Sequence, residues 1–300
     1  MRGLRASLGA LLVAAMASPA AADFDAGAAA YAAGDYAAAF EEWRAPAVAG
    51  EAEAQFALGN LYVNAEGIKQ DFDEARAWFE KAAAQGHAGG QYNLGLVFDQ
   101  GWIGERDPVA AAAWWRKAAA QNHAGAQYQL GLQHEHGWGV EADMDEAMRW
   151  YRLAAGQGYA SAQYSLGLIY AKGRGVAPDA AEAAGWYQKA ADQGFADAEY
   201  NLAVLYFKGE GVAEDYDEAA RLYQSAAEKG SIDAQNNLAG MYALGLGVAQ
   251  DFVTAYMWAT LAAAEDAQNA EENLARIAER LSAEQIAEAE RLAAEWKPRE

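Results

Sequence analysis

The stretch "AQYSLGLIYAKGRGVAPDAAEAAGWYQKAADQG", residues 162–194, is one copy of a pattern that recurs along the chain. At a shift of 36 residues, six copies align with one another without a gap. One position of the pattern holds Gln55, Gln91, Gln127, Gln163, Glu199 and Gln235. Three residues later every copy has a leucine, from Leu58 to Leu238. Self-similarity at a fixed period of this length is typical of proteins whose repeats stack on their neighbours.

Each copy predicts a helix, a turn, a second helix and a stop. The aspartate that recurs from Asp71 to Asp251 is a good N-cap for the second helix, because its carboxylate accepts hydrogen bonds from first-turn amides. A glutamate three residues later resembles a capping box in four copies: Glu74, Glu146, Glu182 and Glu218. Ser282 and Gln285 have the same spacing. The turn between the helices contains GWGV, GRGV, GEGV or GLGV, and no strand pattern precedes it, so we interpret it as a connection and not as a phosphate-binding loop.

In these positions the chain resembles the Sel1-like repeats, which are relatives of the tetratricopeptide repeat. The resemblance implies an all-α fold, a right-handed α-solenoid of helix-turn-helix repeats with a 36-residue period, whose first helices line a concave face. It also implies adaptor-type work, often in bacterial envelope signalling or polysaccharide export. We expect an N-terminal partial repeat at residues 23–50, six repeats at residues 51–266 and capping helices at residues 267–300. About sixteen helices follow from this division.

Residues 1–22 predict a secretory signal peptide. Two arginines precede an apolar run from Leu8 to Ala17, and small residues continue to Ala22. We therefore expect cleavage after Ala22 and a mature protein that is periplasmic or secreted. The chain has no cysteine and a formal net charge of −21. Such acidity argues against nucleic acid or an anionic membrane as a partner, because both demand a basic surface, and we expect no membrane-spanning segment.

The sequence predicts neither a catalytic centre nor a bound metal or cofactor. His134, Glu135 and His136 form a candidate metal site, but histidines two residues apart do not share a helical face. His87 and His123 fall at the other edge of the repeats and cannot complete that site. Neither an HExxH nor a GxSxG motif is present. Some secreted relatives are linked to β-lactam binding or hydrolysis, but those are cysteine-rich, so a hydrolase of this type is the weakest alternative.

Variable positions on the first helices form the main candidate binding surface. With 100° of rotation per residue, Gln55, Leu61 and Tyr62 fall near Leu58 on the packing face. The opposite positions predict a concave wall of tyrosines with acidic patches: Tyr92, Asp99, Tyr128, Glu135, Tyr164, Tyr200 and Phe207. The alternative is that the tyrosines pack between adjacent first helices, because aromatic residues at helical spacing are usually part of the core.

The turns supply a second candidate surface. Trp102 and Trp138 occupy the same turn position in neighbouring copies, where they can anchor a protein partner, stack on a sugar or pack against the next turn. We expect a non-enzymatic scaffold or regulator in the bacterial envelope that binds a peptide segment or an envelope protein. The alternative is a module that binds cell-wall material or exopolysaccharide.

Overall fold

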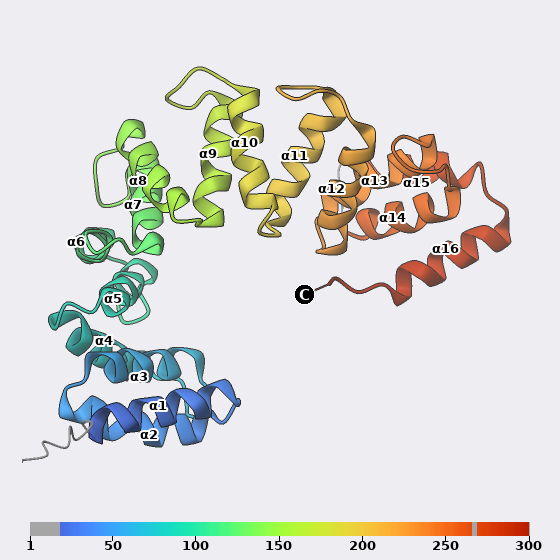
Figure 1. Cartoon of the computed structure of the whole chain (residues 1–300). Helices are drawn as coiled ribbons and strands as arrows, with labels where there is room; N and C mark the ends of the chain where they lie inside the picture. Colours follow the sequence, from blue (N-terminus) through green and yellow to red (C-terminus); the bar gives the residue numbers. More distant parts are fainter. Residues whose placement is uncertain (1–18, 266–268, 300) are drawn as a thin grey trace, which may run out of the picture. The chain divides into compact units, whose positions relative to one another are not determined.

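A computed structural model describes residues 19–265 and 269–299, with side chains from Phe24 onward. Over these residues the chain forms sixteen α-helices and no strand, as the repeat pattern predicts (Figure 1). The helices are α1 Pro19–Ala32, α2 Tyr36–Ala49, α3 Ala52–Asn64, α4 Phe72–Ala84, α5 Ala88–Gln100, α6 Pro108–Ala119, α7 Ala124–His136, α8 Met144–Gly156, α9 Ala160–Lys172, α10 Ala180–Ala191, α11 Ala196–Lys208, α12 Tyr216–Glu228, α13 Ile232–Leu244, α14 Phe252–Ala264, α15 Ala270–Ala278 and α16 Ala283–Glu295.

The helices belong to two compact units. The first unit ends at Gln121 and contains α1 to α6, and the second begins at Asn122 and contains α7 to α16. Within each unit, up to α14, every odd-numbered helix packs against the even-numbered helix that follows it, and that helix packs against the next odd-numbered one. Both α15 and α16 pack against α14 and so cover the last repeat. None of the helices in the described ranges has the length and apolar character needed to cross a membrane.

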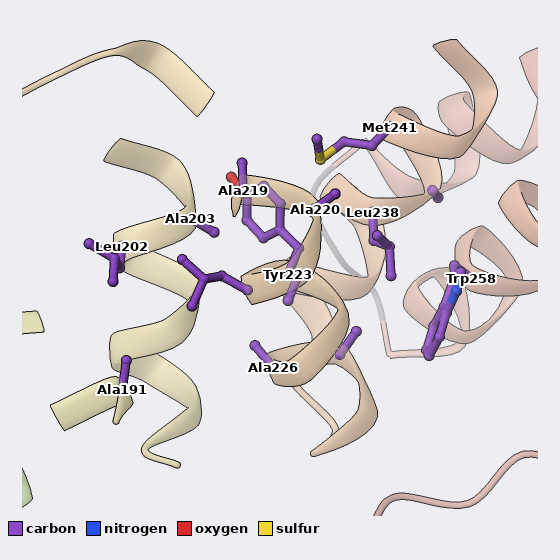
Figure 2. Packing of buried hydrophobic residues seen from close by; sticks show 14 of the residues in the cluster. Ala191, Leu202, Ala203, Ala219, Ala220, Tyr223, Ala226, Leu238, Met241 and Trp258 are labelled. Carbon is purple, nitrogen blue, oxygen red and sulfur yellow. The ribbon is translucent and has the colours of Figure 1, made fainter. Parts of the chain in front are cut away.

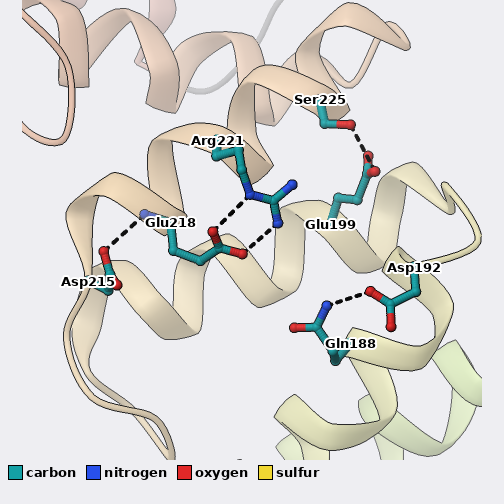
Figure 3. A network of polar contacts seen from close by, with 7 residues as sticks. All are labelled: Gln188, Asp192, Glu199, Asp215, Glu218, Arg221 and Ser225. Atoms are coloured by element: carbon teal, nitrogen blue, oxygen red, sulfur yellow. Dashed lines mark hydrogen bonds and ion pairs between the residues drawn. The ribbon is translucent and has the colours of Figure 1, made fainter.

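The recurring aspartates cap the second helices as predicted. In every repeat the carboxylate accepts a hydrogen bond from a first-turn amide: Asp71, Asp107, Asp143, Asp179, Asp215 and Asp251. Only the aspartate half of the predicted capping box forms in the fifth repeat. Glu218 binds Arg221 on its own helix and not the N-cap amide (Figure 3). This charge-assisted contact is stronger than one to a neutral amide. Glu146 binds Arg149 in the same way. The complete capping box is the one between Ser282 and Gln285.

The glycine-rich turns are connections, and their second glycine is required by packing. Gly209 ends α11 with φ 66°, and Gly211 also has a positive φ of 73°. A Cβ at Gly211 would lie 2.3 Å from the carbonyl carbon of Ala180, at the start of the second helix of the preceding repeat. The turn therefore packs directly on the backbone of its neighbour, where no other residue fits.

Small residues on the first helices face large rings on the second helices. A Cβ at Gly167 would lie 2.4 Å from Cε1 of the buried Tyr187 ring. In the next repeat Tyr223 lies between α11, near Ala203, and α13, near Leu238 (Figure 2). Each ring thus fills the space between consecutive first helices, and this packing makes the repeats depend on one another.

The recurring glutamine bridges neighbouring repeats inside the core. Gln163 donates from Nε2 to the carbonyl of Ala155 at 3.2 Å, and its Oε1 accepts from Nε2 of Gln193 at 2.7 Å. The same amide pair joins Gln55 to Gln85, Gln91 to Gln121 and Gln127 to Gln157. These bonds satisfy a side chain that would otherwise be costly to bury.

Candidate functional site

The predicted tyrosines are half-buried, and three of them contact other rings of their own repeats. The Tyr128, Tyr164 and Tyr200 rings lie 5.7, 5.9 and 5.9 Å from those of Tyr151, Tyr187 and Tyr223, respectively. Burial raises the pKa of Tyr164 and Tyr200. In the first unit, Tyr92 is also half-buried, and its carbonyl accepts a hydrogen bond from Trp115 Nε1. The rings of Tyr128, Tyr164 and Tyr200 therefore pack against second helices and still remain partly exposed.

The two predicted acidic patches are paired with arginines of the turns. The buried Asp99 forms an ion pair with Arg106 at 2.9 Å. Glu135 accepts a hydrogen bond from the Tyr151 hydroxyl at 2.7 Å and pairs with Arg174 from the following repeat. Both carboxylates thus hold structure together inside their own unit. The helical projection did not identify the two arginine partners, because both arginines lie in turns outside the first helices.

The two predicted tryptophans differ in exposure. Trp102 is half-buried and stacks on Phe72 with ring centroids 5.1 Å apart. Trp138 is 42% exposed and stacks on His136 at 4.4 Å. Of these two tryptophans, it is therefore Trp138 that presents a large aromatic surface to solvent.

The histidines have structural contacts. Nδ1 of His87 accepts a hydrogen bond from the Gly90 amide at 3.0 Å, so this histidine caps α5, a role that the sequence interpretation missed. His123 caps α7 in the same way. Among the described residues, no three His, Cys, Asp or Glu side chains are grouped so that they can hold a metal ion.

A groove opens beside α13 where the sixth repeat departs from the pattern. The tyrosine position is Asn236 in this repeat, and the position that holds Leu132, Leu168 or Val204 in earlier repeats is Gly240. A Cβ at Gly240 meets no described atom within 4 Å. The resulting pocket has a volume of about 370 Å³ and is lined by Tyr200, Val204, Phe207, Lys208, Tyr223, Asn236, Asn237, Gly240, Met241, Leu244, Leu246 and Asn273. Two of the predicted residues, Tyr200 and Phe207, are therefore brought together in one pocket.

A second pocket of about 420 Å³ adjoins the first one. The two share Gly240, Leu244 and Asn273, and the second adds residues of α14 and α15, among them Phe252 and Ile277. Leu244 is 69% exposed where they meet. We refer to the two pockets together as the α13 groove. It is large enough to receive side chains of a bound segment.

Amide side chains form a fixed polar floor in the α13 groove. Asn273 Nδ2 donates to Asn236 Oδ1 at 2.9 Å, and Arg276 donates to Asn273 Oδ1. Asn237 also lines the first pocket, beside Tyr200 and Tyr223. These bonds position the amides before any partner arrives, which lowers the entropy cost of binding.

The stacked helical hairpins and the groove on their first helices define the class: an α-solenoid repeat protein. Residues 52–87, 88–123, 124–159, 160–195, 196–231 and 232–266 match the Sel1 repeat. The chain therefore belongs to the Sel1 repeat family, whose members typically mediate protein–protein interactions.

Two solved structures support this assignment. A protective antigen present in uropathogenic Escherichia coli strains, which displays an SLR fold, is 32% identical with a TM-score of 0.82, and the match covers 92% of this chain. The chain spans 60% of the length of that antigen. A Sel1 repeat protein from Oxalobacter formigenes is 35% identical with a TM-score of 0.70, over 80% of this chain and 96% of that one. No curated protein matches the chain significantly.

Proposed function

We propose that this chain is an exported, non-enzymatic scaffold that binds an extended segment of a protein partner in the α13 groove. The observation that carries the proposal is the loss of bulk at Asn236 and Gly240. Glycine inside a helix lowers helix stability by about 1 kcal/mol relative to alanine, and Gly240, unlike other helical glycines in open space, lines both pockets of the groove. The missing side chain leaves space for a ligand, because a side chain at this position would lie where the two pockets join.

The test is to fill the groove without disturbing the fold. In Gly240→Leu the new side chain enters open space and improves helix propensity, so the variant should remain folded. Gly185→Leu is a matched control, because Gly185 is exposed on α10 and a Cβ there also meets no described atom within 4 Å. Both variants and the unmodified chain are used to capture proteins from a bacterial envelope extract. A partner that binds the unmodified chain and Gly185→Leu, but loses at least about tenfold in affinity for Gly240→Leu, supports the groove.

Two other outcomes count against the proposal. Equal capture by all three proteins would move the binding surface away from α13. Retention on purified peptidoglycan or exopolysaccharide, abolished in Trp138→Ala and unchanged in Gly240→Leu, would favour the polysaccharide-binding alternative through the exposed Trp138 ring.

Export rests on the predicted signal peptide, of which residues 1–18 lie outside the described residues. The proposed cleavage after Ala22 falls within α1 and leaves Phe24, whose carbonyl accepts from Trp43 Nε1 at 3.1 Å and whose ring stacks on Trp43 at 5.9 Å. The shortened α1 therefore keeps an anchor on α2. Mass spectrometry of the protein from a periplasmic fraction should give a chain that begins at Asp23, and a cytoplasmic chain that begins at Met1 would refute export.

A further inference from the structure

We infer that the segment bound in the α13 groove is acidic and carries an apolar side chain as its anchor. This inference rests on the proposed function and adds the chemistry of the partner. The charges around the groove, the apolar lining between them and the fixed amides of its floor all point to such a segment.

Basic residues gather at the α13 groove of a chain that is otherwise acidic. The chain carries 22 basic and 43 acidic residues. Lys208 lines the first pocket, and Arg276 and Arg280 line the second, where the one carboxylate among the described lining residues is Glu279. Three cations therefore lie along one groove.

Because of ionic screening, the charges nearest the groove contribute most to the electrostatic potential that a bound segment meets. At physiological ionic strength the Debye length is about 8 Å, so carboxylates farther than this from the groove are largely screened from a segment that lies in it. Arg280 is held over the Phe252 ring at 5.0 Å and Arg276 by its bond to Asn273, so both guanidinium groups have defined positions. Lys208 lies 3.9 Å from Glu210, and both side chains are more than half exposed, which makes this a weak pair. A partner carboxylate can therefore compete for Lys208.

The lining between the cations is apolar. Phe207, Met241 and Leu246 contribute to the first pocket, and Leu244 stands exposed where the two pockets meet. Covering such a surface with an apolar side chain of the partner yields about 25 cal/mol for each Å² removed from water. The asparagine amides carry donors and acceptors suited to the backbone of an extended segment. An apolar residue flanked by Asp or Glu on both sides fits this order of cation, apolar lining and cation.

In the experiment, a library of random displayed peptides is selected for binding to the immobilised full chain. Acidic residues next to an apolar residue should be enriched. A selected peptide is then synthesised in three forms, with its Asp and Glu retained, replaced by Asn and Gln, or replaced by Lys, and its affinity is measured by fluorescence polarisation. We expect the acidic form to bind most tightly, and its affinity to fall about fivefold to tenfold in Lys208→Glu. Lys69→Glu is the matched control, because Lys69 is exposed in a turn of the first unit.

The outcomes separate this inference from the proposed function. If Gly240→Leu abolishes peptide binding while Lys208→Glu and the Asn and Gln form bind unchanged, the groove stands and the acidic partner is refuted. If neither variant affects binding, both proposals fail. If no peptide is enriched, and the unmodified chain self-associates in sedimentation experiments while Gly240→Leu stays monomeric, the occupant is a second copy of this acidic chain. The inference of a separate acidic partner is then wrong.

Discussion

The fifth repeat replaces the buried amide pair of the four preceding repeats with an ion pair. Glu199 is 5% exposed, and its Oε1 accepts from Lys229 Nζ at 2.6 Å and from Ser225 Oγ at 2.8 Å, the latter drawn in Figure 3. Its Oε2 is buried and has no hydrogen-bond partner among the residues that the structure describes. Glutamines occupy the two corresponding positions in the repeat before, where Gln163 and Gln193 are 2.7 Å apart. The two substitutions therefore depend on each other.

Changing one partner alone should be costly. Removing one member of a buried ion pair typically destabilises a protein by about 3 to 5 kcal/mol. The Lys229 side chain is 31% exposed, and glutamine still supplies an N–H donor, so we expect Lys229→Gln to lower the free energy of unfolding by about 2 to 3 kcal/mol. In the double variant with Glu199→Gln, the new amide can also donate to the Ala191 carbonyl as Gln163 does to Ala155. Its stability should therefore lie within about 1 kcal/mol of the unmodified chain or above it.

Urea unfolding of the unmodified chain, both single variants and the double variant gives the coupling energy between the two positions. Because repeat arrays can unfold locally, amide hydrogen exchange of α11 and α12 is measured alongside. We expect a coupling of about 2 kcal/mol. If Lys229→Gln costs less than about 0.5 kcal/mol, or if the effects of the two single variants simply add, the ion pair is not the coupled unit described above.

Two further predictions concern the aromatic core. Gly167→Ala should lower the free energy of unfolding by about 1 kcal/mol, because its Cβ meets the Tyr187 ring while helix propensity improves, whereas Gly240→Ala in open space should raise it by up to about 1 kcal/mol. The loss of stability in Gly167→Ala stays moderate because the next repeat already has an alanine, Ala203, opposite its ring, Tyr223. Equal effects of the two variants on urea unfolding would contradict this packing. Burial raises the pKa of Tyr187 and Tyr223 above the unfolded value of about 10, so the stability from their burial is complete below pH 10 and is lost as the pH rises towards the folded pKa. Tyrosinate absorbance and circular dichroism should therefore change together in alkali, and ionisation of these rings with intact helices would contradict the prediction.

Local patterns made the secondary structure predictable. The aspartate caps depend on residues within one helical turn, so Asp215 and its equivalents are identified from spacing alone. The capping role of His87 was missed because histidine is an uncommon N-cap. The ion pair between Glu218 and Arg221 was missed because a glutamate at this position can bind either the N-cap amide or an arginine three residues further along the helix.

The candidate site was predictable only in part. The helical projection placed Tyr200 and Phe207 on the face that lines the groove. The departures at Asn236 and Gly240 are visible in the aligned copies and were the signal that could have located it. Their meaning depends on which residues of α11, α14 and α15 surround them, and spacing within one repeat does not contain that information.

By itself, the sequence determined the repeat period, the class of fold, the helix caps and the turns, because these depend on interactions between residues close in the chain. Tertiary structure decided which half-buried side chains are structural and where space remains. Glu135 acquires its arginine partner, and Gly240 its open surroundings, only when separate repeats pack together. Burial and ion pairing are properties of these assembled neighbours, so they become known only with the fold.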